Sequence, residues 1–307
     1  MTIAALLGAV LMLSIPLTAQ VSPGTFRSPD GTLVHFDRQG TGEPVVLLAG
    51  GPGMTPAYLE PVREHLARAS QCVLVHQRGT GRSLVPAGRL ATEITLRRFV
   101  SDLETVRVGL KQDRLTLVGH SWGGMLAMAY AAAFPDRTKA LILIASGGPT
   151  LDYMNWYGKN AAGRVNDEDR RITAYWEDQR KEGVDSILVA AGLVAAEMSS
   201  TFYDRSKVRE LAVSLGDNPF SVPVFDQMMR DLRATRYDLR PQLKTFRGPV
   251  LVVQGRPDPI ATADTLRATF AAARLEVELI DQVGHFPWLE RPDVLFQRID
   301  SFLRSLQ

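Results

Sequence analysis

The chain has 307 residues, of which 45% are hydrophobic and 22% are charged, an ordinary globular composition that excludes a disordered chain and a membrane helix bundle. Its 35 basic and 33 acidic residues leave a net charge of +2 without a basic run, so we expect no nucleic acid partner. Cys72 is the single cysteine, which excludes an intrachain disulfide and a thiolate metal cluster.

The N-terminus differs from the rest of the chain. No charge occurs from Ile3 to Leu17, and Pro16 and the small residue Ala19 follow the apolar stretch. This pattern is typical of a secretory signal peptide, although the segment before the apolar stretch lacks Lys and Arg. An uncleaved anchor is the alternative, since about 20 apolar residues span a bilayer. We therefore predict that residues 1–20 are a signal peptide or an N-terminal anchor, and that the protein is secreted or periplasmic, or membrane-anchored if the segment is retained.

The first part of the mature chain alternates strand and helix patterns. Residues 32–37 predict a short antiparallel edge strand before a turn. Continuous apolar runs predict strands buried on both faces at 45–49 and 72–75, and further strands are expected at 115–118 and 140–144. Apolar residues three or four apart between 92 and 113 predict an amphipathic helix, and a second helix is expected over 125–134. This alternation predicts an α/β fold with a mostly parallel sheet and helices on both faces.

The pattern changes between residues 148 and 246, where strand-like runs disappear and helix-compatible sequence takes over. Strands are expected again at 249–253 and 275–280, with helices at 263–272 and from 292 onward. We therefore predict an α/β core over 24–147 and 247–307, interrupted by a helical cap over 148–246.

The segment Gly119-His120-Ser121-Trp122-Gly123 lies between a buried strand and an alanine-rich helix. In that context the G-x-S-x-G pattern predicts the sharp turn that presents a serine nucleophile in the α/β-hydrolase fold. Ser121 is the candidate nucleophile, and we expect His120 to pack beside the turn.

In this fold the acid and the histidine follow the nucleophile in chain order. Asp258 follows the strand at 249–253, and His285 follows the strand at 275–280. Asp264 is the competing acid, but we expect it on the solvated face of the next helix. His285 is the one histidine after Ser121, so chain order assigns it as the base.

The oxyanion hole is expected to combine the N–H groups of Gly51 and Trp122. Gly51 precedes Pro52, so this bond is a candidate for the cis isomer. His65 and His120 lack a second ligand at metal-ligand spacing, and we expect neither a metal site nor a cofactor.

Three motifs resemble those of the proline iminopeptidase family, also called prolyl aminopeptidases. They are Ala49-Gly50-Gly51-Pro52-Gly53 for H-G-G-P-G, His76-Gln77-Arg78-Gly79-Thr80-Gly81-Arg82-Ser83 for D-Q-R-G-x-G-x-S, and the elbow, with Asp102, Glu104 and Arg107 fitting its D-x-E-x-x-R. Ala49 and His76 depart from the family pattern. The resemblance implies an α/β-hydrolase that releases N-terminal proline from a short peptide or small-molecule substrate.

The resemblance also implies a cap carboxylate that pairs with the substrate's amino group. Glu177 is the first candidate and Glu197 the second, while Trp176 and Trp156 are candidates for the wall of an apolar pocket. A solvated helix face and the cap's own core are the alternative explanations for these residues. Esterase, lactonase, carbon–carbon bond hydrolase and acyltransferase activities stay open, as does a non-catalytic binding protein on a hydrolase scaffold, since fold does not fix substrate.

Overall fold

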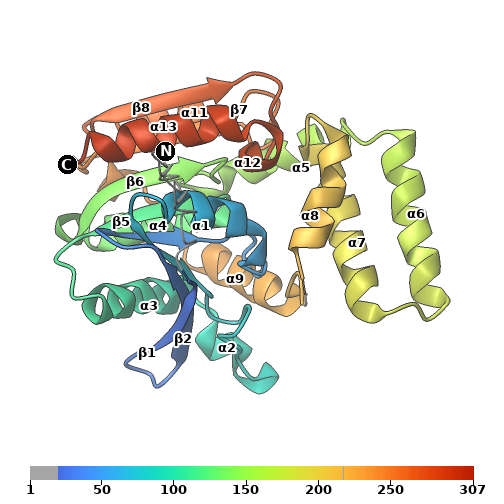
Figure 1. Ribbon diagram of the computed structural model, residues 1–307, viewed down its shortest axis with the longest axis horizontal. Coiled ribbons are helices and arrows are strands. Elements are labelled where there is room, and N and C mark those ends of the chain that lie inside the picture. The colour runs from blue at the N-terminus through green and yellow to red at the C-terminus, as the bar shows by residue number, and fades with distance from the viewer. Residues whose placement is uncertain (1–19, 217) are drawn as a thin grey trace, which may run out of the picture.

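The computed structural model describes residues 20–216 and 218–307 (Figure 1). The predicted signal peptide or anchor, apart from Gln20, lies outside the described residues. No helix in the part of the chain that the structure describes has the length and apolar character needed to cross a membrane.

The described residues form an eight-stranded sheet with the order β1-β2-β4-β3-β5-β6-β7-β8 (Figure 1). The strands are β1 (Ser22–Arg27), β2 (Leu33–Gln39), β3 (Pro44–Leu48), β4 (Gln71–Val75), β5 (Leu115–His120), β6 (Thr138–Ile144), β7 (Val250–Gly255) and β8 (Leu275–Ile280). β2 pairs antiparallel with both β1 and β4, and every other pairing in the sheet is parallel. The mostly parallel sheet predicted from the apolar runs is therefore confirmed.

The position of β2 corrects one expectation, because this strand is not at the edge of the sheet. β1 pairs along its whole length with β2 and forms the edge instead. The sequence of β1 is Ser-Pro-Gly-Thr-Phe-Arg, whose exposed and half-buried side chains give no apolar pattern. Its pairing comes from the backbone and from Phe26, which stacks on Phe36 of β2.

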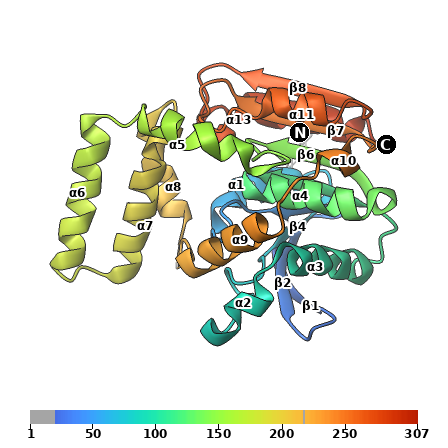
Figure 2. The same ribbon diagram turned by 180° about the vertical axis from the view of Figure 1, so that it is seen from behind.

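Helices cover both faces of the sheet, as predicted. Outside the cap segment they are α1 (Glu60–Leu66), α2 (Leu90–Glu93), α3 (Leu96–Gly109), α4 (Trp122–Ala133), α11 (Ala263–Thr269), α12 (Pro287–Glu290) and α13 (Pro292–Arg304). Val46 and Leu48 of β3 join the core cluster that contains α3 and α4, whereas Val45 and Leu47 join the cluster that contains α1 and α13. Successive side chains of one strand thus supply two cores. Helices accordingly lie on both sides of the sheet (Figures 1 and 2).

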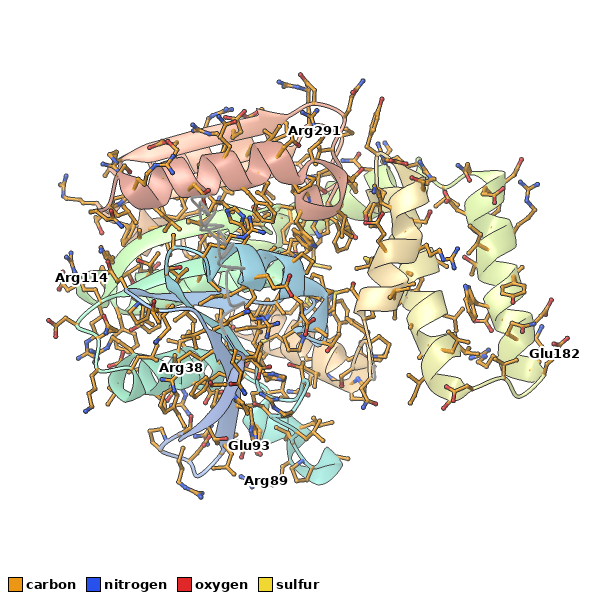
Figure 3. The ribbon with its side chains drawn as sticks, in the orientation of Figure 1. Arg38, Arg89, Glu93, Arg114, Glu182 and Arg291 are labelled. Carbon is orange, nitrogen blue, oxygen red and sulfur yellow. The ribbon has the colours of Figure 1, made fainter. Side chains whose placement is uncertain are left out.

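The segment between β6 and β7 contains the helices of the predicted insertion. They are α5 (Met154–Ala162), α6 (Asp167–Lys181), α7 (Ser186–Met198), α8 (Val208–Ser214), α9 (Val222–Ala234) and α10 (Arg240–Leu243). α6 and α7 lie side by side and project away from the sheet, with Glu182 at the far end of the pair (Figures 1 and 3). α9 instead packs on the sheet side, where Val224 and Met228 are part of the core.

A buried arginine fixes the β1–β2 turn against the core. Arg78 is fully buried and forms ion pairs with Asp30, Glu93 and Asp102 at 2.6–2.8 Å. Glu93 also binds Arg89, its neighbour in Figure 3, at 2.6 Å. Three carboxylates around one guanidinium therefore connect the turn before β2 with α2 and α3.

The sheet topology determines where the site forms. β3, β5, β7 and β8 are parallel, so their carboxyl ends lie at one edge of the sheet, the edge that faces the helical insertion (Figure 1). Ligand sites in such sheets form outside these ends. The loops that carry Gly51, Ser121, Asp258 and His285 are the ones that leave them.

Candidate active site

Ser121 occupies a strained turn between β5 and α4. Its backbone has φ 54° and ψ −118°, a conformation that residues with a Cβ rarely adopt. Neighbouring backbone groups hold it there: Ser121 N–H donates to the Ile144 carbonyl at 3.0 Å, and the Ser121 carbonyl accepts from Gly124 at 3.0 Å and Gly147 at 3.2 Å. The turn lifts the Ser121 side chain out of the strand and to the wall of a cavity.

The glycines around Ser121 permit this turn by their lack of a side chain. A Cβ at Gly119 would collide with the backbone of Gly123, and a Cβ at Gly123 would collide with the Leu48 carbonyl at the end of β3. The helix that follows the nucleophile can therefore approach two strands closely.

The structure brings His285 and Asp258 together from the loops after β8 and β7. His285 Nδ1 lies 3.0 Å from Asp258 Oδ2, and both side chains are buried, with exposures of 6% and 0%. Asp258 Oδ1 also accepts the Ile260 N–H at 3.0 Å, which fixes the carboxylate. Asp264 lies on α11 with a 91% exposed side chain and pairs with Arg267 at 2.5 Å. Asp264 is thus on a solvated face, while Asp258 is in contact with the histidine.

The loop that carries His285 is held by the segment that enters α8. His285 N–H donates to the Thr201 carbonyl at 2.9 Å, and the Gly284 N–H donates to Glu290 Oε2 at 2.7 Å. Oε1 of Glu290 accepts the N–H groups of Tyr203 and Asp204 at 2.8 and 2.7 Å. Burial raises the pKa of Glu290 despite these three donors. One carboxylate therefore joins the cap segment to the histidine loop.

Gly51 and Trp122, the expected oxyanion donors, line the same cavity as Ser121 and His285. Gly51 has φ 112°, which favours glycine, and the Gly51-Pro52 peptide bond is cis, as the sequence suggested. The glycine loop thus runs along the cavity wall beside the nucleophile.

The cavity has a volume of about 300 Å³ and a predominantly apolar lining. This volume is at the lower end of the ~300–1,000 Å³ found for small-molecule sites. Its described lining residues include five methionines, Met54, Met125, Met154, Met198 and Met229, and the aromatic residues Tyr153, Tyr157, Phe220, Phe225 and Phe286. Burial and the nearby Asp258 carboxylate raise the pKa of Tyr157 to about 12, so its phenol keeps its proton.

The predicted substrate-contact residues of the cap divide into two groups. Glu197, the second candidate, lines the cavity from α7. Glu177, the first candidate, forms an ion pair with Arg180 at 2.5 Å, and the Trp176 ring lies where a Cβ on Gly192 would have to fit. Trp156 donates its indole N–H to the Ile260 carbonyl at 2.9 Å. Glu177, Trp176 and Trp156 are not among the described residues that line the cavity.

Sequence reasoning missed the side chains behind the cavity wall. Tyr58 and Gln77 are buried and make hydrogen bonds to the glycine loop, and His120 has more specific contacts than packing beside the turn. Gln77 belongs to the His76–Ser83 motif, and that motif was the sequence pattern that could have predicted its role. No sequence pattern marked Tyr58. Within residues 20–216 and 218–307, no group of three His, Cys, Asp or Glu side chains is arranged to hold a metal ion.

The sequence matches the family described as alpha/beta hydrolase fold over residues 43–292. A proline iminopeptidase of Heyndrickxia coagulans is 27% identical over 88% of this chain and 94% of its own length. A cis-3-alkyl-4-alkyloxetan-2-one decarboxylase of Shewanella oneidensis is 36% identical, but the match spans 40% of this chain and only 38% of that relative. A proline iminopeptidase of Lactobacillus delbrueckii subsp. bulgaricus is 41% identical over a match that spans 33% of this chain and 35% of that relative's length.

Solved structures agree on the fold. Proline iminopeptidase of Mycobacterium smegmatis superposes with a TM-score of 0.69 at 21% identity, covering 93% of this chain and 98% of that one. Est816, described as an N-acyl homoserine lactone degrading enzyme, has a TM-score of 0.66 at 24% identity, covering 91% of this chain and 100% of its own. At these identities the likeness concerns the fold alone. Because the family match covers most of the chain and the sheet, elbow and loops agree with it, this chain belongs to the alpha/beta hydrolase fold family.

Proposed function

We propose that this protein is a serine hydrolase that works through an acyl-enzyme. The observation that carries the proposal is the buried His285–Asp258 pair, at 3.0 Å, beside a cavity that Ser121 and His285 both line. In this mechanism Asp258 orients His285, and the base takes the proton of Ser121 as its Oγ bonds to the substrate's carbonyl carbon. The N–H groups of Gly51 and Trp122 stabilise the oxyanion.

The remaining steps return the enzyme to its starting state. The tetrahedral intermediate collapses as the bond to the leaving group breaks, and His285 gives its proton to that group. Water then attacks the acyl-enzyme, again with His285 as base, and Ser121 is released with its proton restored. Every proton that moves passes through one imidazole, which is why its orientation by Asp258 matters.

The substrate that we favour is a peptide or arylamide with a free N-terminal proline. Glu197 is the one carboxylate among the described residues that line the cavity, and no described cation forms an ion pair with it. An exposed carboxylate that lines an apolar cavity suits a substrate with one cationic amino group and an apolar ring. A relative that matches along most of this chain is a proline iminopeptidase, which supports the same choice.

A second candidate is an esterase or lactonase acting on an apolar acyl group. The methionine-rich lining supports it, because thioether side chains adapt to flexible apolar ligands. Under this alternative the Glu197 side chain lines the cavity without contacting the substrate.

A substrate panel separates these functions. Wild type, Ser121→Ala and Glu197→Gln are assayed on proline p-nitroanilide, on its N-acetyl form and on p-nitrophenyl esters of increasing acyl length. An aminopeptidase cleaves the first and not the second, and Glu197→Gln raises KM for the free amine about 10-fold while ester hydrolysis stays constant. Equal cleavage of free and acetylated proline, or preference for esters with no effect of Glu197→Gln, supports the second candidate. Wild-type rates in Ser121→Ala would overturn the serine mechanism, and a wild type without turnover or fluorophosphonate labelling would favour a non-catalytic scaffold.

A further inference from the structure

The residues on each side of Ser121 are both connected to the glycine loop that precedes Gly51. On one side, the Gly50 N–H donates to Tyr58 Oη at 2.7 Å, and Tyr58 Oη lies 2.7 Å from His120 Nδ1. His120 directly precedes the nucleophile. Tyr58 and His120 are both buried, so these bonds do not compete with solvent.

On the other side of Ser121, the link runs through Gln77. The Trp122 indole N–H donates to Gln77 Oε1 at 2.8 Å, and Gln77 Nε2 donates to the Ala49 carbonyl at 2.7 Å. Trp122 directly follows the nucleophile and supplies one of the two proposed oxyanion N–H groups. Ala49 and Gly50 directly precede Gly51, which supplies the other.

The hydrogen-bond directions in the Tyr58 link are fixed by chemistry. Gly50 N–H can only donate, so Tyr58 Oη accepts there and its own O–H donates to His120 Nδ1. His120 then carries its proton on Nε2, which donates to the His285 carbonyl at 2.9 Å. The neutral imidazole satisfies every group in this chain of bonds, and the same residue contacts the backbone of the proposed base.

We propose that Tyr58, His120 and Gln77 are positioning residues that hold the oxyanion donors of Gly51 and Trp122 at a fixed geometry around Ser121. This inference rests on the proposed serine mechanism. The two donors come from loops 71 residues apart in the sequence, and the β3–β5 pairing that brings these loops together ends at Leu48 and Gly119, before either donor. Beyond that point the two side-chain links hold the donors, one through each neighbour of the nucleophile, and His120 adds the backbone of His285 to the same frame.

The physical consequence concerns the transition state and not substrate binding. Loss of one oxyanion donor lowers rates by about 10²–10³, and a donor that is displaced but still present loses part of that effect. Removing either link should therefore slow the step in which negative charge develops on oxygen, with little change in binding before it.

A fluorophosphonate tests this without knowledge of the natural substrate. Ser121 Oγ bonds to phosphorus as the P–F bond breaks, fluoride leaves, His285 takes the serine proton, and the phosphoryl oxygen occupies the oxyanion hole. Tyr58→Phe and Gln77→Met each remove one link at nearly constant volume. Tyr130→Phe is the matched control, because it removes another buried hydroxyl, bonded to Glu104 at 2.8 Å, away from the cavity.

The maximal labelling rate, kinact, and the half-saturating concentration, KI, are measured together with the unfolding midpoint. We expect kinact to fall about 10- to 100-fold in Tyr58→Phe and Gln77→Met, with KI and the control within about twofold of wild type. A kinact unchanged in both variants would overturn the inference, as would a loss that matched the unfolded fraction. Labelling of Ser121→Ala, or no labelling of wild type, would instead refute the proposed serine mechanism and the positioning role with it. If one variant fails to fold, the other decides the outcome alone.

Discussion

Ser121 should store conformational energy that glycine would release. Its φ of 54° and ψ of −118° place it in a region that costs a residue with a Cβ about 1–3 kcal/mol. Glycine avoids that cost but gains about 0.5–1 kcal/mol of entropy in the unfolded chain. We therefore expect Ser121→Gly to raise the free energy of unfolding by about 1 kcal/mol. Ser121→Ala keeps the Cβ and the strain, so its stability should stay within about 0.5 kcal/mol of wild type.

The comparison of these two variants isolates the strain. Both lack the nucleophilic oxygen and should lose turnover, so activity does not distinguish them. Urea unfolding at pH 7, monitored by tryptophan fluorescence, gives the difference in stability between glycine and alanine at residue 121.

Ser101, in the interior of α3, is the matched control. There glycine should be about 1 kcal/mol less stable than alanine, the usual order in a helix. The reasoning fails if glycine is no more stable than alanine at position 121, or if the difference has the same sign at both positions.

Three further perturbations follow from the structure. Asp258→Asn should lower kcat about 10⁴-fold, because an amide in place of the carboxylate no longer holds His285 in the tautomer that carries its proton on Nδ1. Asp264→Asn should match wild type, and equal effects of the two substitutions in steady-state assays would contradict the assignment. Arg78→Met should lower the free energy of unfolding by about 3–5 kcal/mol at pH 7, since three carboxylates lose their buried cation. Urea unfolding measures this change, and a loss below about 1 kcal/mol would refute the prediction. Burial is the main reason that the pKa of His120 lies well below 6.5, and the neighbouring His285 lowers it further. The folded state therefore keeps His120 neutral, whereas the same residue in the unfolded chain takes up a proton below pH 6.5. The contribution of neutral His120 to the free energy of unfolding is therefore complete above pH 6.5 and is lost as pH falls, by up to about 1.4 kcal/mol per pH unit. His120→Gln should reduce the slope of the free energy of unfolding against pH between pH 6.5 and 5. An unchanged slope would contradict this prediction.

Local sequence was enough to predict the strands of the central sheet and the turn at Ser121. A strand covered on both faces by helices favours apolar side chains at successive positions, so β3 and residues 140–144 of β6 are continuous apolar runs, and residues 115–118 of β5 depart from one only at Thr116. The elbow is equally local, because the glycines around Ser121 are required by atoms within a few residues or at the end of the adjacent strand. By contrast, strand β1 was not predicted, since its pairing depends on backbone hydrogen bonds to β2 and not on an apolar pattern.

Chain order placed Asp258 and His285 after the correct strands, but only the tertiary structure shows that their side chains meet at 3.0 Å and that Asp264 faces solvent. The lining of the cavity could not be predicted from the sequence either, because it too depends on side chains that only the tertiary structure brings together. Glu177 lies in the charged helix α6, where Arg180 three residues on is a local partner, whereas Glu197 lies in the alanine-rich helix α7. Only the packing of α7 in the folded chain places the Glu197 carboxylate at the cavity wall.

The sequence by itself therefore determined the family, the sheet and the candidate nucleophile. Buried strands require apolar residues at neighbouring positions, and close backbone approach requires glycines, so both features can be recognised in a short segment. Tertiary structure decided the shape and lining of the cavity, the location of its carboxylate, and the Tyr58 and Gln77 links between the glycine loop and the elbow. Those features join side chains that are distant in sequence, and a hydrogen bond between such residues depends on where the folded chain brings them and imposes no pattern on either segment alone.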